Sequence, residues 1–301
     1  MAKVSILMNS YNSERYLKKA IDSVYAQTFD DWEIIFIDNC STDGTKKIVD
    51  GYSDKIKYFK TKKNLNLGSA RNFGLRYCCA DYLAFLDTDD IWVDSKLEKQ
   101  VKAMDEDTAL VYSSLITIDS NGKDLRKTKI NKAPNFPSLL NRYDINMLTV
   151  MINLRLIKFK FKFDENLSYC PDYDVFMDLA AQQLKFKSID IPLARYRIHG
   201  NSLSSKTKDI QVKEISIVLN KLQKKYPYLS EEYQELLNNS IIKSKYLIKT
   251  KFFLKEEDYF NAAITLLLLS KINKKYLIFS APLFLPVINR LIYKLIISKY
   301  L

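Results

Sequence analysis

The sequence predicts an α/β fold, a mixed sheet flanked by helices, followed by a helical C-terminal region. Short apolar segments alternate with amphipathic ones through the first hundred residues. Parallel strands need crossover connections, so this alternation requires a parallel sheet with helices on both faces. Residues 210–272 are rich in Leu, Ile, Lys and Glu and have helical periodicity.

The first strand is expected at 4–8, and the helix after it is expected to begin at Ser13, a residue type that caps helices. One face of that helix is apolar, through Leu17, Ala20, Ile21, Val24 and Tyr25. Further strands are predicted at 33–37, 56–59 and 82–86, and helices at 46–52 and about 69–77.

Beyond residue 105 the alternation weakens and the class becomes mixed. The apolar run 110–118, the turn residues 120–122 and the polar stretch after them predict a hairpin. Within 210–272, Pro227 ends one helix and Ser230 can cap the next. We therefore expect two parts, 1–205 with halves 1–105 and 106–205, and a helical part, 206–301.

The composition, 301 residues of which 47% are hydrophobic, is enough for a sizeable core and argues against disorder. The net charge of +12 is uneven, because residues 210–301 carry 15 Lys and Arg against seven Asp and Glu. An anionic partner is expected for that region. The four cysteines form no C-x-x-C pair and are expected to be reduced core residues.

The last segment, 276–301, interleaves large apolar residues with basic ones, as an in-plane membrane helix does. A nucleic-acid tail would not need so many aliphatics, and an alternative is packing onto the rest of the chain or between subunits. The longest uncharged apolar stretch, 276–289, is shorter than the roughly 20 residues of a spanning helix. The start of the chain lacks the layout of a secretory signal. We expect a cytoplasmic protein, peripheral at the inner face of the cell membrane.

Carboxylates follow two predicted strands. Asp38 follows 33–37, and Asp87 and Asp89 follow 82–86. Two carboxylates one residue apart can share a hard divalent ion, Mn²⁺ or Mg²⁺, with the phosphate oxygens of a substrate. Ligands bind beyond the carboxyl ends of such strands. The alternatives are a solvated Asp turn at 87–90, and a turn at 39–42 that Asp38 caps.

Several segments together resemble family 2 glycosyltransferases of the GT-A fold, which has a Rossmann-like mixed sheet. The resemblance covers about 1–205, leaving the basic tail outside it. The segments are VSILMNSYNSE (4–14), SVYAQT (23–28), IDNCSTD (37–43), ARNFG (70–74), FLDTDD (85–90), PDYD (171–174) and YRIHGNS (196–202).

The resemblance implies roles for residues of the donor site. Ser10, Tyr11 and Glu14 match the nucleoside pocket, where a ring stacks on the base and a carboxylate accepts from ribose hydroxyls. Asp38 matches the carboxylate that reads the base edge. The family usually has a second Asp there, and Asn39 stands in its place.

Other matches concern the diphosphate and the metal. Arg71, at the start of a helix, is expected to hold the pyrophosphate, the alternative being an exposed surface Arg. Asp87 and Thr88 are expected to bind the donor, and Asp87 and Asp89 the metal. His199, the only histidine, is a further metal or diphosphate contact, the alternative being a structural side chain.

For inversion, the attacking hydroxyl needs a base, and Asp172 matches it. Pro171 replaces the Glu usual before it, and Asp174 is a rival base. An alternative is that Asp172 caps a helix at 173–181.

These matches imply a metal-dependent inverting glycosyltransferase of hexosyl or N-acetylhexosaminyl type. The expected donor is a UDP-sugar, and the expected acceptor is a hydroxyl of a lipid-carried or surface glycan. A nucleotidyltransferase would need a Gly-rich phosphate loop, and 9–14 contains no glycine. A second alternative is a catalytically weak nucleotide-binding scaffold in a glycan-assembly complex.

Overall fold

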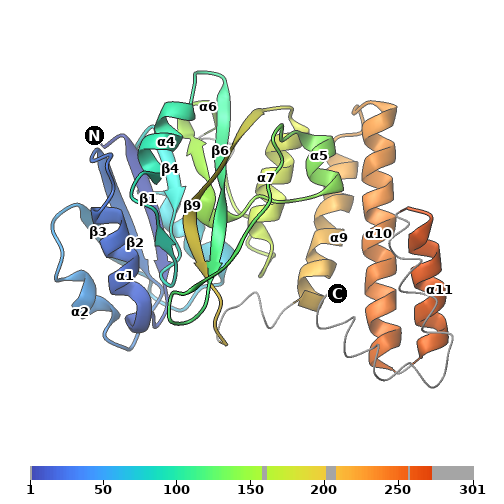
Figure 1. The fold of residues 1–301 in the computed structure, drawn as a ribbon, viewed down its shortest axis with the longest axis horizontal. Helices are drawn as coiled ribbons and strands as arrows, with labels where there is room; N and C mark the ends of the chain where they lie inside the picture. The colour runs from blue at the N-terminus through green and yellow to red at the C-terminus, as the bar shows by residue number, and fades with distance from the viewer. Residues whose placement is uncertain (1, 158–160, 201–207, 257, 273–301) are drawn as a thin grey trace. The chain divides into compact units, whose positions relative to one another are not determined.

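The computed structural model describes residues 2–157, 161–200, 208–256 and 258–272 (Figure 1). The chain divides into two units, Met1–Ser205 and Lys206–Leu301. The strands of the first unit are β1 (Val4–Ser10), β2 (Trp32–Asp38), β3 (Ile56–Lys60), β4 (Tyr82–Phe85), β5 (Ile91–Trp92), β6 (Thr108–Ile118), β7 (Asp124–Lys127), β8 (Met151–Asn153) and β9 (Lys185–Arg197). Its helices are α1 (Glu14–Tyr25), α2 (Thr45–Val49), α3 (Leu67–Leu75), α4 (Lys96–Ala103), α5 (Phe136–Asn141), the 3₁₀ turn η1 (Met147–Thr149), α6 (Leu154–Ile157) and α7 (Pro171–Ala181).

One mixed sheet runs through the first unit in the order β3-β2-β1-β4-β8-β6-β9-β5, with β7 paired to β6. The strands β3, β2, β1 and β4 are parallel, as predicted from the alternation of the first hundred residues. Strand β8 is antiparallel to β4 and β6, whereas β9 is parallel to β6 and antiparallel to β5. The parallel strands end at one edge, where Ser10 and Asp38 are partners in register.

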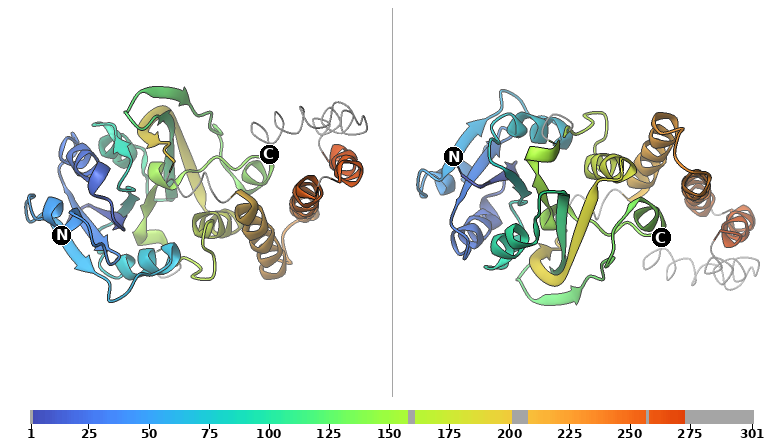
Figure 2. Two further views of the ribbon diagram at one scale, coloured as in Figure 1. Left: turned by 90° about the horizontal axis from the view of Figure 1, so that it is seen from below. Right: turned by 90° about the horizontal axis from the view of Figure 1, so that it is seen from above.

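Helices cover both faces of the parallel strands (Figure 2). On one face the apolar side of α1, including Leu17 and Ile21, packs with Ile6 and Phe36 in one buried cluster. On the other face α3 approaches so closely that a Cβ on Gly74 would lie 2.4 Å from Leu7 Cδ1. Glycine at this position therefore sets the distance between α3 and the sheet.

Ser13 occupies the N-cap position of α1, as predicted. Its side chain makes no capping hydrogen bond, so the prediction that Ser13 caps the helix is wrong. The loop before α2 and the first residue of α2 supply the acceptors instead. The Glu14 N–H donates to Asp43 Oδ2 at 3.0 Å, and the Ser13 N–H donates to Thr45 Oγ1 at 3.0 Å. The Ser13 hydroxyl is thereby left to accept from Thr88 Oγ1 at 2.8 Å.

The predicted hairpin is confirmed, since β6 and β7 are antiparallel. Gly122 in its turn has φ of 95°, a backbone conformation that favours glycine. The long strand β9 was not predicted from the sequence. All four cysteines are free, but only Cys78 and Cys170 are buried, so the expectation of core positions is wrong for exposed Cys79.

The described part of the second unit consists of α9 (Lys208–Lys225), α10 (Glu231–Lys255) and α11 (Tyr259–Ser270). Pro227 lies between α9 and α10, and the Ser230 side chain accepts from the Tyr233 N–H, which confirms the predicted break and cap. Within the described residues no helix is both long and apolar enough to cross a bilayer. The segment 276–301, for which a membrane contact is expected, lies outside them.

Candidate active site

The carboxyl end of β4 carries the acidic segment that sequence analysis singled out. The Asp87 carboxylate lies 3.7 Å from the guanidinium of Arg71, which is 6% exposed and lies over the Phe163 ring at 5.5 Å. The alternative of a surface arginine is therefore wrong. A fixed, buried guanidinium beside a strand-end carboxylate can bind a phosphate group as a bidentate donor.

Asp172 belongs to the same electrostatic environment as Asp87. The pKa of Asp87 is raised above its usual value by desolvation and by the carboxylates of Asp89 and Asp172, whereas Arg71 lowers it. Asp172 lies in the first turn of α7, which begins at Pro171 after an N-cap at Cys170, so the alternative that Asp172 caps this helix is wrong. Asp89, from the same segment, and Asp172, from a distant one, thus both act on the charge of Asp87.

Asp172 also neighbours a tyrosine that sequence analysis missed. The ring of Tyr143 packs edge-on against Tyr173 at 4.7 Å. Its hydroxyl is buried and has no hydrogen-bond partner among the described residues. Burial and then the charge of Asp172 raise the pKa of Tyr143 well above its usual value. Tyr143 lies in a region without a recognisable motif, so nothing in the sequence pointed to it as a residue of the site.

Asp89 is joined to His199, whose Nε2 lies 2.9 Å from the Asp89 Oδ2. The His199 ring also packs against Tyr16, with centroids 5.4 Å apart. No group of three or more His, Cys, Asp or Glu side chains is arranged to hold a metal among the residues that the structure describes. The Asp89–His199 pair nevertheless suits a hard cation, because adjacent ligands at about 2.1 Å in an octahedral shell lie about 3 Å apart.

Asp90 and Arg197 hold this segment in place, a role that the motifs did not suggest. The Arg197 N–H donates to Asp90 Oδ1 at 2.7 Å, and its Nε donates to the Asp89 carbonyl at 2.8 Å. The same guanidinium donates to the carbonyls of Asp119 and Ser120 in the β6–β7 turn. Arg197 and Asp90 are each 1% exposed, so both side chains lie in the interior.

The predicted nucleoside residues gather at the ends of β1 and β2. Ser10 is buried, and its hydroxyl has no hydrogen-bond partner in the described part of the chain. Asp38 is 1% exposed; its Oδ1 accepts from the Ser41 N–H at 2.7 Å, and its Oδ2 accepts from the Tyr58 hydroxyl. The alternative role of Asp38, capping the turn after β2, is therefore present. Burial and the neighbouring Asp38 raise the pKa of Tyr58.

Asn39, which stands where the family usually has a second carboxylate, uses both ends of its amide. Its Oδ1 accepts from the Leu65 N–H at 2.8 Å, and its Nδ2 donates to the Leu65 carbonyl at 2.8 Å. Thr61 Oγ1 also donates to Oδ1 at 3.1 Å. A carboxylate could not donate to the Leu65 carbonyl, so the amide is what holds the segment before α3 against the end of β2.

Tyr11 and Glu14 are exposed, so both side chains are accessible to a ligand. Glu14 Oε2 accepts from the Gly44 N–H at 3.0 Å, at the start of α2. Asn12, between them, has φ of 51°, and its Oδ1 accepts from the Thr42 N–H at 2.8 Å. The loop after β1 is therefore fixed to the loop after β2.

The predicted residues thus form two sets on neighbouring strands. Arg71, Asp87, Asp89, Asp172 and His199 are linked by contacts or by charge around the end of β4. Asp38 contacts Ser41 in the loop after its own strand, and Tyr58 and Lys60 of β3. The Thr88–Ser13 hydrogen bond connects the segment after β4 to the loop after β1, and so connects the two sets.

Known proteins similar to this chain are glycosyltransferases. The family described as "Glycosyl transferase family 2" matches residues 5–162. An uncharacterized glycosyltransferase of Methanocaldococcus jannaschii is 35% identical over 206 residues, 65% of this chain and 70% of the relative. The UDP-Glc:alpha-D-GlcNAc-diphosphoundecaprenol beta-1,3-glucosyltransferase WfgD of Escherichia coli is 31% identical over 208 residues, 67% of this chain and 79% of the relative.

Among solved structures, residues 1–349 of Staphylococcus aureus TarS in complex with UDP-GlcNAc align with a TM-score of 0.71 at 17% identity. The alignment covers 99% of this chain and 91% of that one. At this identity the likeness concerns the fold alone, and it confirms the predicted GT-A type of mixed sheet with a helical region after it.

Proposed function

The chain belongs to glycosyl transferase family 2, and on that premise we propose that it moves a sugar from a nucleotide diphosphate sugar to an acceptor hydroxyl with inversion. The observation that carries this proposal is that Asp89 and Asp172 both act on the charge of Asp87, which lies beside the buried Arg71. Carboxylates held close to one another repel, and a cation or a reacting group that uses them relieves that repulsion.

The nucleoside is assigned to the ends of β1 and β2. Ser10 offers a buried hydroxyl that needs a partner, and Tyr11 offers an exposed ring on which a base can stack. Asp38 retains lone pairs beyond those used by Ser41 and Tyr58, and can accept from the base edge. Glu14 is assigned to the ribose hydroxyls.

Asp87, Asp89 and His199 are assigned to Mn²⁺ or Mg²⁺, with Arg71 and Thr88 on the donor's diphosphate. A bound divalent cation supplies positive charge against the negative charge that develops on the departing nucleoside diphosphate. Arg71 adds a second positive group whose position is fixed by burial and by Phe163.

Asp172 is assigned as the general base. The acceptor hydroxyl attacks the anomeric carbon from the face opposite the leaving group and transfers its proton to the Asp172 carboxylate as the new bond forms. Pro171 at the first helical position fixes the backbone from which Asp172 projects. Inversion follows from a single displacement.

A UDP-linked hexose or N-acetylhexosamine is the proposed donor, and a lipid-carried or surface glycan is the proposed acceptor. The name of the E. coli relative, a transferase from UDP-Glc to a diphosphoundecaprenol-linked sugar, supports both. Such an acceptor is held in a membrane. We therefore place the protein at the inner face of the cell membrane, with the basic segment 276–301 contacting anionic lipid.

The test is a panel of UDP-, dTDP- and GDP-sugars assayed for hydrolysis and transfer, with and without Mn²⁺. Metal-dependent turnover of one donor, and NMR detection of an inverted product, are expected. Nucleotide binding in a thermal-shift assay without turnover of any donor would favour the scaffold alternative, which Pro171 and Asn39 in place of acidic residues support. Retention of configuration would contradict the role of Asp172.

A further inference from the structure

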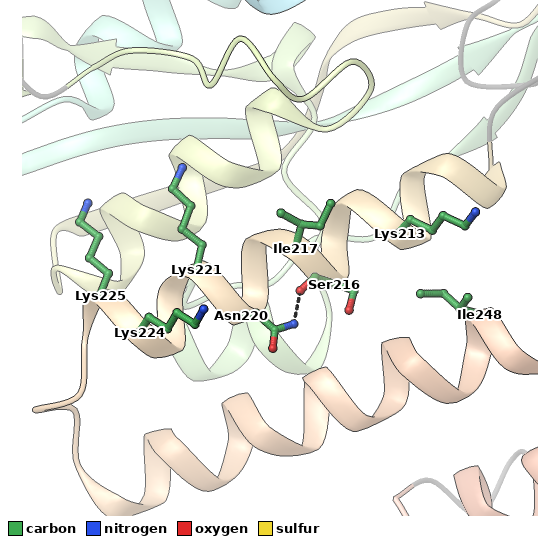
Figure 3. A pocket seen from close by; sticks show the side chains of 8 residues that line it. All are labelled: Lys213, Ser216, Ile217, Asn220, Lys221, Lys224, Lys225 and Ile248. Atoms are coloured by element: carbon green, nitrogen blue, oxygen red, sulfur yellow. Dashed lines mark hydrogen bonds between the residues drawn. The ribbon is translucent and has the colours of Figure 1, made fainter.

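A basic groove crosses the second unit along α9 and α10 (Figure 3). It has a volume of about 710 Å³, and a second depression of about 400 Å³ adjoins it, with Ile248 lining both. The side chains of the first come from α9 except for Ile248 of α10 (Figure 3). Among the described residues that line the two hollows there are six lysines and no Asp or Glu: Lys213, Lys221, Lys224, Lys225, Lys245 and Lys249.

The lysines alternate with apolar side chains at helical spacing. On α9, Lys213, Ile217, Lys221 and Lys224 follow one another at intervals of four, four and three residues, which places them on one side of the helix. Ile217 is 59% exposed. This face therefore offers positive charge and bare aliphatic surface together.

Helix α10 repeats the pattern with Ile242, Lys245, Lys249 and Phe252, spaced three, four and three residues apart. Ile242 is 41% exposed and Phe252 is 58% exposed. Exposed apolar side chains gathered on one face mark a site of contact with a protein or a membrane. They suit a surface whose phosphates lie above an apolar layer, as in an anionic bilayer.

We propose that this α9–α10 face docks on an anionic phospholipid surface. The inference rests on the proposed function for its membrane location, but assigns the contact to helices other than 276–301. Charge excludes two other occupants. The segment 273–301 carries five Lys and Arg and no Asp or Glu, so laying it in the groove would bring like charges together. A second copy packed by two-fold symmetry would place lysines against lysines.

Nucleic acid would also neutralise the lysines. It would leave Ile217, Ile242 and Phe252 without an apolar partner, so a bilayer fits the whole face better. The headgroup phosphates would meet the lysine ammonium groups while the apolar side chains enter the acyl boundary.

The experiment is flotation of the full chain with vesicles of 70% phosphatidylcholine and 30% phosphatidylglycerol, compared with phosphatidylcholine alone. The variant Lys213→Glu/Lys249→Glu should bind the anionic vesicles roughly tenfold or more weakly. The charge-matched control Lys19→Glu/Lys102→Glu, on exposed lysines of α1 and α4, should bind as the natural protein does. Lys213→Arg/Lys249→Arg should also retain binding.

A second variant, Ile217→Ser/Phe252→Ser, keeps the charge and should weaken vesicle binding even at 0.5 M salt, where lysine contacts are screened. Equal flotation of the groove variants and the natural protein overturns the proposal, as does an equal loss in the control. Capture of a 30-nucleotide RNA without vesicle binding overturns it in favour of nucleic acid. Donor hydrolysis without vesicles should be unchanged in the groove variants, so failure here is separable from failure of the proposed transferase.

Discussion

His199 Nε2 lies 2.9 Å from Asp89 Oδ2, joining two residues 110 positions apart in the chain. Asp89 follows the end of β4, and His199 follows the end of β9, which lies three strands away from β4 in the sheet. Arg197 holds Asp89 in place by donating a hydrogen bond to the Asp89 carbonyl. The Arg197 guanidinium carbon also lies 4.6 Å from the centroid of the Tyr16 ring. The end of β9 therefore contributes Arg197, which holds Asp89, and the residues just after it contribute His199, which contacts Asp89.

We predict that His199→Asn weakens the apparent affinity for Mn²⁺ by roughly 10- to 100-fold. Asn lacks the imidazole nitrogen that reaches Asp89, so the carboxylate is left without its orienting partner. The measurement is a titration of transferase activity with Mn²⁺ at saturating donor. High Mn²⁺ should restore part of the rate. An unchanged titration curve would show that His199 is only a structural side chain.

Asp172→Asn is expected to lower the transfer rate by about 10²- to 10⁴-fold, because an amide cannot take the proton of the acceptor hydroxyl. Binding of UDP with Mn²⁺, followed by thermal shift, should be retained. Asp178→Asn on the same helix, where Asp178 accepts from Gln182, is the matched control. If Asp174→Asn abolishes turnover and Asp172→Asn does not, the rival is the base.

The same substitution has a second expected effect, on pH dependence. Because the charge of Asp172 raises the pKa of Asp87, removing that charge should lower the pKa of Asp87. Asp87 would then stay ionised to lower pH, and the acid limit of Mn²⁺-dependent nucleotide binding should move to lower pH in Asp172→Asn. The measurement is a series of thermal shifts with UDP and Mn²⁺ between pH 4 and 7. A shift to higher pH, or none, would contradict the proximity of the two carboxylates.

The elements of the first hundred residues could be predicted well from the sequence because strand-like and helix-like segments alternate there. Each β-α unit shows its own periodicity, and strand-end residues such as Asp38 and Asp87 must meet at one edge of a parallel sheet. Strand β9 could not be found in this way, since its sequence alternates poorly and its register with β6 shifts at three places. The contacts of Arg197 and Tyr143 were hidden because neither residue lies in a segment whose periodicity predicts its partner.

Asn39 shows how a departure from a motif becomes understandable only in three dimensions. We predict that Asn39→Asp destabilises the fold by about 1–3 kcal/mol, because it leaves the Leu65 carbonyl facing a carboxylate instead of an N–H donor. Urea unfolding at pH 7 measures the change. Asn64→Asp, on an exposed side chain that accepts from Asn39, is the control and should be nearly neutral. Equal stability of the two variants would show that the Leu65 contact is unimportant.

Lys96 is fully buried in α4, and its ammonium lies 4.1 Å from the Trp92 ring centroid. Its Nζ donates a hydrogen bond to Gln100 Oε1. Burial lowers the pKa of Lys96 well below its usual value. In the unfolded chain a lysine titrates near its reference pKa of about 10.4. Between these two values unfolding takes up a proton, so this residue makes the free energy of unfolding rise with pH, by at most about 1.4 kcal/mol per pH unit.

Lys96→Met removes the contribution of Lys96 to the pH dependence of the free energy of unfolding, whatever the substitution does to stability at any one pH. We therefore predict that the difference in melting temperature, natural protein minus Lys96→Met, increases steadily from pH 7 to 9.5. All other titrating groups are shared and cancel in the difference, and Lys99→Met, on a partly exposed lysine of the same helix, should show no such trend. A difference that stays constant or falls with pH would mean that Lys96 remains charged in the folded protein, balanced by Trp92 and Gln100.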